Sequence, residues 1–572
     1  MIRVALAQLD LTVGDIDGNS ARITEAIAQG ERDGAQIVAL PELAVTGYPP
    51  EDLVLKRAFV AANRAAVDEI AVATGEALAV VGFVDAGREA LFNAAAVCHR
   101  GKLLAIYHKH LLPNYGVFDE RRYFDGGKGH CLFESDRGVI GVCICEDVWS
   151  ERGPVVSQGD AGAQLVININ ASPFHKGKLQ ARERLLGDRA RRARAAIAYV
   201  NMVGGQDELV FDGGSMIVGP DGEIVARMPQ LEEDFAIFDV PLGSADRTDG
   251  AAVQRIPVEL RAIEGTREPT LADPLDDVEE IYRALVVALR DYVAKNGFER
   301  VVIGLSGGID SSLTAAIAAD ALGAERVLGI AMPSEFSSSH SIEDAKQLAA
   351  NLGIEMLEIP ISEPFHAFLE ALRGAFGKVK PGLAEENLQA RVRGNILMAT
   401  SNRYGHLVIT TGNKSEMACG YATLYGDMAG GFALLKDVFK TEVYELARWR
   451  NRAAEAIPPN VLSKPPSAEL RANQKDSDSL PPYEILDPIL EAYIEEERGI
   501  GEIVEGGADR ETVEKVVALV DRAEYKRRQA APGPKVTTKA FGRDRRLPIT
   551  NKWREGPDRG LPRKVTGEKR EK

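Results

Sequence analysis

The sequence predicts an α/β protein built from two domains. Its length of 572 residues is too great for one ordinary hydrophobic core. Apolar strand-like runs alternate with longer helical stretches along both halves of the chain, which is the pattern of α/β folds. One of these runs ends in the pair Gly307–Gly308, directly before a helix-forming segment. A strand, a glycine loop and a helix in this order indicate a parallel sheet that binds a phosphate group.

Composition and charge exclude several classes of protein. With 45% hydrophobic and 27% charged residues the chain is globular, and a formal net charge of −16 disfavours nucleic acid as a partner. The first ten residues reach an acidic side chain too early for a signal peptide, and no apolar run approaches membrane-spanning length. We therefore expect a cytoplasmic protein with no membrane partner. Five cysteines, an odd number, predict reduced thiols rather than a disulfide framework.

The first domain is predicted over residues 1–265. It includes a linker through residues 244–250 and 264–274, where charged residues, glycine and proline replace the alternating pattern. Its apolar runs predict six strands, over residues 4–8, 37–40, 79–84, 93–99, 139–145 and 165–168.

The second domain is predicted over residues 266–572. It begins with a helix after Pro274 and ends in a charged tail from Arg554 onward. Helical stretches separate four predicted strands, which fits a doubly wound, Rossmann-like parallel sheet; these are residues 301–305, 327–332, 356–359 and 406–411. The proline-rich segment 457–488 is either a lid over a nucleotide or a disordered surface loop.

The glycine loop has the sequence Ser306-Gly-Gly-Ile-Asp-Ser-Ser312. Its glycines let backbone N–H groups approach an anion, and its serines add hydroxyl donors. It has neither the lysine of a γ-phosphate loop nor the spacing of a dinucleotide turn. The motif resembles the loop of ATP pyrophosphatases, which adenylylate a substrate oxygen on an adenine nucleotide α-hydrolase-like fold. The resemblance implies that ATP is bound by Leu305, Ser306, Gly307, Gly308, Ile309, Asp310, Ser311 and Ser312.

The first domain carries a candidate nucleophile, Cys145, at the end of an apolar strand. A thiol with a pKa of about 8.5 needs activation at neutral pH, and a nearby cation is expected to raise its thiolate fraction. Glu42 and Lys109 each follow another predicted strand and offer a base and a cation. Alternation along a strand places Cys143 and Cys145 on the same face, so geometry predicted from the sequence leaves both open.

These three motifs resemble the nitrilase superfamily, whose members hydrolyse amides or nitriles on an α-β-β-α sandwich. The resemblance implies that Glu42 is the general base, that Lys109 stabilises the oxyanion and that Cys145 forms the thioester. It favours Cys145 over Cys143 because Glu146, Asp147 and Trp149 follow Cys145 as in the family. It further implies a glutamine pocket lined by Tyr48, Tyr115, Glu146, Ser172 and Lys178, with lysine at the last position where some members have arginine.

Together the two halves resemble glutamine-dependent NAD synthetases over essentially the whole chain. The resemblance implies a ligase that adenylylates deamido-NAD with ATP and amidates it with ammonia, taken from glutamine or supplied free. The products are NAD, AMP, pyrophosphate and glutamate, in the final step of NAD biosynthesis. It also implies a homo-oligomer, Mg²⁺ held by Asp310 and Glu416, further ATP contacts at Thr411, Lys440 and Ser467, and deamido-NAD contacts at Asn387, Arg391, Glu416 and Lys526. Leu424 stands where ammonia-dependent relatives have lysine, so no contact is inferred there.

Other ATP-dependent enzymes share the same loop. Asparagine synthetase needs an N-terminal cysteine, and residue 2 here is Ile2. GMP synthetase needs a Cys-His-Glu glutaminase, and the histidines at 108, 110 and 175 form no such pattern. A tRNA-thiolating enzyme is disfavoured by the acidic charge balance. A binding protein with a degenerate loop is disfavoured because Asp310, Glu42, Lys109 and Cys145 are all present.

Overall fold

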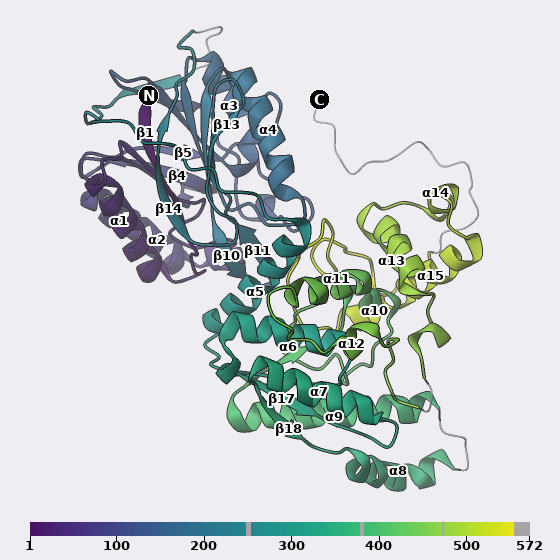
Figure 1. Ribbon diagram of the computed structural model, residues 1–572. Coiled ribbons are helices and arrows are strands. Elements are labelled where there is room, and N and C mark those ends of the chain that lie inside the picture. Colours follow the sequence, from purple (N-terminus) through teal and green to yellow (C-terminus); the bar gives the residue numbers. More distant parts are fainter. Residues whose placement is uncertain (247–252, 378–381, 472–473, 554–572) are drawn as a thin grey trace. The chain divides into compact units, whose positions relative to one another are not determined.

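The computed structural model describes residues 1–246, 253–377, 382–471 and 474–553. The charged tail predicted from Arg554 lies outside these residues. The chain forms two compact units, Met1–Gly297 and Phe298–Lys572 (Figure 1). The first unit extends past the boundary expected near residue 265, because helix α5 (Asp277–Lys295) packs on the β10–β11 hairpin of that unit (Val203–Gln206 and Leu209–Asp212).

Two sheets form the centre of the first unit (Figure 1). The first sheet has the strand order β14-β1-β2-β3-β4-β5, with bounds Asp234–Val240, Ile2–Gln8, Ile37–Ala39, Leu78–Ala86, Leu91–His99 and Lys102–His108. The second has the order β13-β12-β9-β8-β7-β6-β15, with bounds Ile224–Arg227, Met216–Val218, Ala196–Asn201, Leu165–Asn170, Val139–Ile144, His130–Glu134 and Val253–Pro257.

Helices cover the outer faces of both sheets and complete an α-β-β-α sandwich (Figure 1). Helices α1 (Ile16–Arg32) and α2 (Arg57–Ala73) pack on the first sheet, and α3 (Pro154–Asp160) and α4 (Lys178–Ala193) pack on the second. Strand β1 is buried on both faces, so its alternate residues enter two cores. Val4 and Leu6 join the core that includes the second sheet, whereas Ala5 and Ala7 face the core under α1 and α2.

The second unit is built on a parallel sheet of order β18-β17-β16-β19-β20, with bounds Glu355–Glu358, Val327–Ala331, Val301–Gly304, Leu407–Thr410 and Phe432–Ala433. Numbered along the chain, this order is 3-2-1-4-5, the doubly wound topology. All strands are parallel, but the order in which they are added reverses between the first and fourth strands, β16 and β19. Ligands bind outside the carboxyl ends of strands at such a reversal, so the segments after Gly304 and Thr410 mark the expected site.

Helices surround this sheet. Those that contact its strands are α6 (Ile309–Leu322), α7 (Ser339–Leu352) and α9 (Leu383–Tyr404). The others include α8 (Ser362–Phe376), α10 (Lys414–Cys419), α11 (Lys440–Arg450), α12 (Pro459–Ser463), α13 (Tyr483–Leu490), α14 (Ile500–Glu505), α15 (Arg510–Arg522) and α16 (Glu524–Arg527). A separate apolar cluster joins α10 to α13, α14 and α15.

No helix within the described ranges is both long and apolar enough to cross a bilayer.

Candidate active sites

Cys145 lies immediately after strand β7, in a 3-10 turn over Cys145–Val148. Its φ of 41° is in the left-handed region, which a residue other than glycine adopts only at a cost in free energy. The strand alternation expected through residue 145 therefore ends at Ile144. Cys143 remains in the strand and its thiol accepts a hydrogen bond from Asn168 Nδ2 at 3.1 Å, whereas Cys145 is turned out of the strand.

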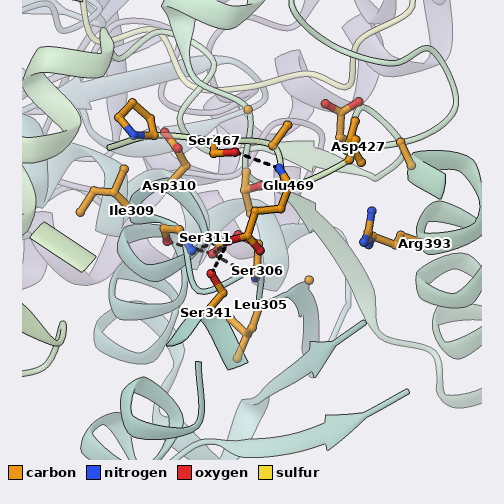
Figure 2. A pocket seen from close by; sticks show the side chains of 18 of the residues that line it. Leu305, Ser306, Ile309, Asp310, Ser311, Ser341, Arg393, Asp427, Ser467 and Glu469 are labelled. Atoms are coloured by element: carbon orange, nitrogen blue, oxygen red, sulfur yellow. Dashed lines mark hydrogen bonds between the residues drawn. The ribbon is translucent and has the colours of Figure 1, made fainter. Parts of the chain in front are cut away.

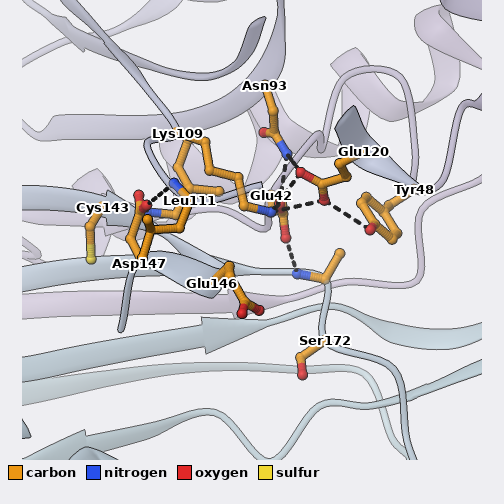
Figure 3. A network of polar contacts seen from close by, with 12 residues as sticks. Glu42, Tyr48, Asn93, Lys109, Leu111, Glu120, Cys143, Glu146, Asp147 and Ser172 are labelled. Carbon is orange, nitrogen blue, oxygen red and sulfur yellow. Dashed lines mark hydrogen bonds and ion pairs between the residues drawn. The ribbon is translucent and has the colours of Figure 1, made fainter. Parts of the chain in front are cut away.

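Lys109 lies between two carboxylates, those of Glu42 and Glu120 (Figure 3). Its Nζ donates to Glu42 Oε1 at 2.7 Å and to Glu120 Oε1 and Oε2 at 2.8 and 2.9 Å. Glu42 also accepts from Asn93 Nδ2 at 2.7 Å and from the Ala171 N–H at 2.9 Å. The structure thus brings the predicted base and cation into direct contact in a buried network.

The charges of this network act on the Cys145 thiol. Burial and the Glu42 carboxylate raise the pKa of Cys145 well above its usual value, and the Lys109 ammonium only partly opposes them. Burial likewise raises the pKa of Glu120 to about 7. The Lys109 charge acts in the expected direction and favours the thiolate, but burial and the Glu42 carboxylate outweigh it.

Each residue predicted to line a glutamine pocket has its own hydrogen-bond partner in the first unit. Tyr115 Oη donates to Glu146 Oε2 at 2.9 Å, and Ser172 is buried with its N–H donating to Asn201 Oδ1. Tyr48 Oη donates to Glu120 at 3.0 Å and so supports the partner of Lys109.

Lys178 is the first residue of α4, and its ammonium lies 4.7 Å from the centre of the Trp149 ring. It makes no ion pair within the described part of the chain. Burial, and then the charge of Arg182, lower the pKa of Lys178 to about 8. A half-buried cation without a carboxylate in ion-pair contact is suited to receive a ligand carboxylate.

Sequence reasoning missed Glu120 and Asn93. Glu120 begins a short 3-10 turn, Glu120–Arg122, within a long loop, and no strand or glycine signal precedes it. Asn93 is inside strand β4, where the sequence does not distinguish a functional amide from an ordinary strand residue.

In the second unit the predicted phosphate loop connects β16 to α6. Gly307 has φ of +74°, and a Cβ at this position would lie 2.1 Å from the Ser341 carbonyl oxygen, so only glycine fits. The Ser306 and Ser311 hydroxyls are 3.0 Å apart, and Ser306 Oγ accepts from the Gly308 N–H. The loop and the N-terminus of α6 form a ready anion-binding surface.

A cavity of about 300 Å³ opens at the point where the sheet reverses, between the ends of β16 and β19 (Figure 2). It brings together most of the predicted ATP residues: Leu305, Ser306, Gly308, Ile309, Asp310, Ser311, Thr411, Lys440 and Ser467, with Glu416 beside them. Gly307 and Ser312 belong to the same loop but do not line the cavity.

Asp310 and Glu416 meet at one buried ammonium, that of Lys440. Lys440 Nζ lies 2.5 Å from Asp310 Oδ2 and 3.5 Å from Glu416 Oε1. Asn413 Nδ2 holds the other Asp310 oxygen at 2.8 Å. Burial, with the nearby Asp310 charge, raises the pKa of Glu416 to about 8, so a further positive charge here would stabilise both carboxylates.

The proline-rich segment contributes to the cavity wall through Lys464–Leu470 and Asp476. Glu469 accepts hydrogen bonds from Ser338 Oγ at 3.0 Å and Ser341 Oγ at 2.8 Å, at the start of α7. Ser467 Oγ donates to the Gln474 carbonyl.

Three of the predicted deamido-NAD residues lie outside this cavity lining. They surround the loop 420–424 instead. Asn387 Oδ1 accepts from Thr423 Oγ1 at 2.8 Å, Arg391 Nε donates to the Leu424 carbonyl, and Lys526 Nζ donates to the carbonyls of Gly420 and Ala422.

Arg393 lines the cavity and was not predicted (Figure 2). It follows Arg391 by two positions on α9, and the sequence contains no signal that ranks it above other helical arginines.

Comparison with known proteins matches both units. The family model described as carbon-nitrogen hydrolase matches residues 3–249, and the one described as NAD synthase matches residues 281–530. Among solved structures, glutamine-dependent NAD+ synthetase from Acinetobacter baumannii in complex with ADP is 43% identical with a TM-score of 0.75, covering 97% of this chain and 100% of that one. A glutamine-dependent NAD(+) synthetase from Cytophaga hutchinsonii is 22% identical with a TM-score of 0.80, covering 96% and 98%, and shows the same fold.

Curated relatives agree over the full length. A glutamine-dependent NAD(+) synthetase from Thermotoga maritima is 50% identical, with 97% of this chain and 99% of the relative covered. The corresponding protein from Aquifex aeolicus is 48% identical, with 97% and 100% covered. The chain therefore belongs to the family of glutamine-dependent NAD(+) synthetases.

Proposed function

We propose that this chain converts deamido-NAD to NAD with ATP, using ammonia that its first unit releases from glutamine. One observation carries the proposal: a buried Glu-Lys-Cys site and a phosphate loop at a sheet reversal occur in the same chain. The first is suited to amide hydrolysis and the second to adenylyl transfer. Together they make a ligase that takes its nitrogen from an amide.

In the first half-reaction Cys145 attacks the side-chain amide carbon of glutamine. Glu42 takes the thiol proton as the bond forms and returns it to the leaving ammonia, since a free thiolate is disfavoured beside two carboxylates. The Lys109 ammonium donates to the oxyanion of the tetrahedral intermediate. Water, deprotonated by Glu42, then hydrolyses the thioester and releases glutamate.

Substrate recognition in this half belongs to the other predicted residues. Lys178 receives the α-carboxylate of glutamine, which supplies the negative charge that its half-buried ammonium lacks. Tyr115 and Glu146 form a hydrogen-bonded pair, and its carboxylate is suited to the α-amino group of the same ligand. Ser172 and Tyr48 complete the pocket.

In the second half-reaction the loop 305–312 and the N-terminus of α6 hold the ATP phosphates. Thr411 and Ser467 line the same cavity, and Lys440 contributes its ammonium to the developing negative charge. The nicotinate carboxylate of deamido-NAD attacks the α-phosphorus and pyrophosphate leaves. Ammonia then attacks the acyl-adenylate carbon, and AMP departs. Asn387, Arg391, Glu416 and Lys526 are proposed to bind deamido-NAD.

The side chains present fit a magnesium ion. No group of three His, Cys, Asp or Glu side chains gathers in the described ranges, so the protein offers two carboxylates, Asp310 and Glu416. Mg²⁺ commonly takes one or two carboxylates and completes its shell with phosphate oxygens and water. When bound, it would neutralise phosphate charge. The family resemblance also leads us to propose a homo-oligomer.

The test supplies the purified chain with ATP, Mg²⁺ and deamido-NAD, with glutamine in one reaction and ammonium in another, and measures NAD and AMP. Cys145→Ala should lower glutamine-driven synthesis by at least about a thousandfold and leave ammonium-driven synthesis within about twofold. Asp310→Ala should abolish NAD synthesis from glutamine and from ammonium, while glutamine hydrolysis persists.

The two variants control for each other. Loss of ammonium-driven synthesis in a folded Cys145→Ala protein would contradict the division of labour between the units. Absence of NAD synthesis by the wild type from either donor would overturn the proposed reaction.

A further inference from the structure

Asp147 is a fully buried carboxylate two residues after the nucleophile, in the turn Cys145–Val148. Both of its oxygens are saturated with hydrogen-bond donors. Oδ1 accepts from the backbone N–H groups of His110 at 3.1 Å and Leu111 at 2.9 Å. Oδ2 accepts from Tyr107 Oη at 2.8 Å and from the Ile144 N–H at 3.1 Å.

The donors come from the two segments that carry the reacting groups. Tyr107, His110 and Leu111 all lie within two residues of Lys109, and Ile144 directly precedes Cys145. Figure 3 shows Asp147 beside Leu111, with the Lys109 side chain reaching away toward Glu42 and Glu120. One carboxylate therefore ties the segment of the oxyanion cation to the segment of the thiol.

Asp147 forms no ion pair within the described ranges, so hydrogen bonds from backbone and tyrosine, rather than a salt bridge, hold its charge. A buried carboxylate of this kind costs desolvation free energy, and an apolar residue would fill the same space without that cost. Cys145 also has φ of 41°, a conformation that persists only where surrounding contacts fix it. The Ile144 N–H bond fixes the residue just before it.

We propose that Asp147 is a positioning residue that fixes the position of the Cys145 thiol relative to the Lys109 ammonium. The inference rests on the proposed glutaminase activity and deepens it. Asp147 does not touch the substrate. It sets the distance between nucleophile and oxyanion donor, on which the rate of a tetrahedral step depends steeply.

An asparagine at position 147 distinguishes the hydrogen bonds to the Lys109 segment from the hydrogen bond to the Cys145 segment. Its amide has one acceptor oxygen, and two backbone N–H groups occupy the Oδ1 side, so the oxygen of an asparagine belongs there. The amide NH₂ then faces Tyr107, whose hydroxyl can turn and accept, and the Ile144 N–H, which cannot. Asp147→Asn thus releases the nucleophile side alone, and Asp147→Ala releases both sides.

The experiment uses the full chain and four readouts: kcat and KM for glutamine hydrolysis, the alkylation rate of Cys145 by iodoacetamide, ammonium-driven NAD synthesis and the thermal midpoint. Asp147→Asn should lower kcat ten- to a hundredfold, leave KM for glutamine within threefold and leave ammonium-driven synthesis within twofold. The alkylation rate at fixed pH should change at least fivefold. Cys145→Ala gives the background from the other thiols.

Glu31→Gln is the matched control. Glu31 likewise accepts backbone N–H bonds, from Gly75 at 2.7 Å and Ala77 at 3.2 Å, but on α1. It should leave all glutaminase constants within twofold.

Two results would overturn the inference. One is a kcat within threefold of wild type and an unchanged alkylation rate in Asp147→Asn, even with a lowered thermal midpoint. The other is a parallel loss of ammonium-driven synthesis, which indicates general unfolding. If Asp147→Ala fails to fold, Asp147→Asn decides. Failure of the proposed function shows in the wild type, as no glutamate released, and the alkylation ratio then still tests Asp147.

Discussion

Arg393 illustrates how a single half-buried charge can indicate a binding role. Its Nε donates to the Met332 carbonyl at 3.1 Å, and its terminal amino groups have no acceptor among the described residues. Burial lowers the pKa of Arg393 to about 10, opposed by the charge of Glu469. A guanidinium that lines a nucleotide-sized cavity and, within the described ranges, has free terminal N–H donors is suited to bind an anion. Its planar, forked geometry suits phosphate.

We expect Arg393→Met to raise KM for ATP at least tenfold, because one charge-assisted contact of about 1.5–3 kcal/mol is lost. KM for glutamine and the glutaminase rate should stay unchanged. Arg393→Lys should recover only part of the loss, since lysine is a point charge. Arg403→Met, an exposed arginine on the same helix, is the control. Steady-state kinetics with ATP varied checks this, and an unaltered KM in Arg393→Met would refute it.

At the residue scale the sequence could identify chemistry but not local geometry. Motif order predicted Glu42 and Lys109, which the structure places 2.7 Å apart. The strand pattern left Cys143 and Cys145 both open and only the family resemblance favoured Cys145, because the end of β7 and the positive φ of Cys145 depend on tertiary contacts such as those of Asp147. Glu120 was not predicted for the same reason, since only the fold brings its loop to Lys109.

At the scale of elements, helix α5 carries a buried acid against the start of α4. Glu280 accepts from Gln230 Nε2 at 2.8 Å and from the Gly177 N–H at 3.3 Å, next to Lys178. Burial, and secondarily the charge of Asp212, raise the pKa of Glu280 to about 7 from 4.5. The folded chain therefore holds this proton more tightly than the unfolded chain does.

The pH dependence of stability follows with a definite sign. The contribution of Glu280 is complete below pH 4.5 and is lost as pH rises through 7, by at most about 3 kcal/mol. Glu280→Gln cannot ionise, so relative to wild type it should be more stable at pH 8 than at pH 5. Thermal midpoints of both proteins at the two pH values measure the difference, in which other titrating groups cancel. An equal difference at both pH values would contradict the assignment.

Long apolar runs made the elements predictable. All ten predicted strands correspond to strands β1, β2, β3, β4, β7, β8, β16, β17, β18 and β19. Other strands were not predicted, for example β10 with sequence Val-Gly-Gly-Gln, because pairing with β11 and packing on α5 stabilise it rather than its own composition.

At the scale of the whole molecule, each unit has its own hydrophobic cores. The clusters between and beside the two sheets contain only residues of the first unit, and the cluster on the parallel sheet contains only residues of the second. The sequence predicted two domains from length and pattern. It did not predict that α5 packs on the β10–β11 hairpin, because an amphipathic helix does not specify which neighbour buries its apolar face.

Separate expression of residues 1–297 and 298–572 should therefore give two folded fragments. Each should show a cooperative thermal transition by circular dichroism, because each retains its own cores. Cutting instead at residue 265 should leave the first fragment less stable by several degrees, since it loses α5. A first fragment of 1–265 as stable as that of 1–297 would argue against the later boundary.

The left-handed conformation of Cys145 has a consequence for inheritance. A side chain held at φ of 41° costs on the order of 1–3 kcal/mol, and glycine at the same place relieves that cost. A mutation from cysteine to glycine therefore removes the proposed nucleophile and relieves this backbone cost in one step. In a lineage with abundant ammonia, the backbone at this position does not oppose the loss of glutamine use.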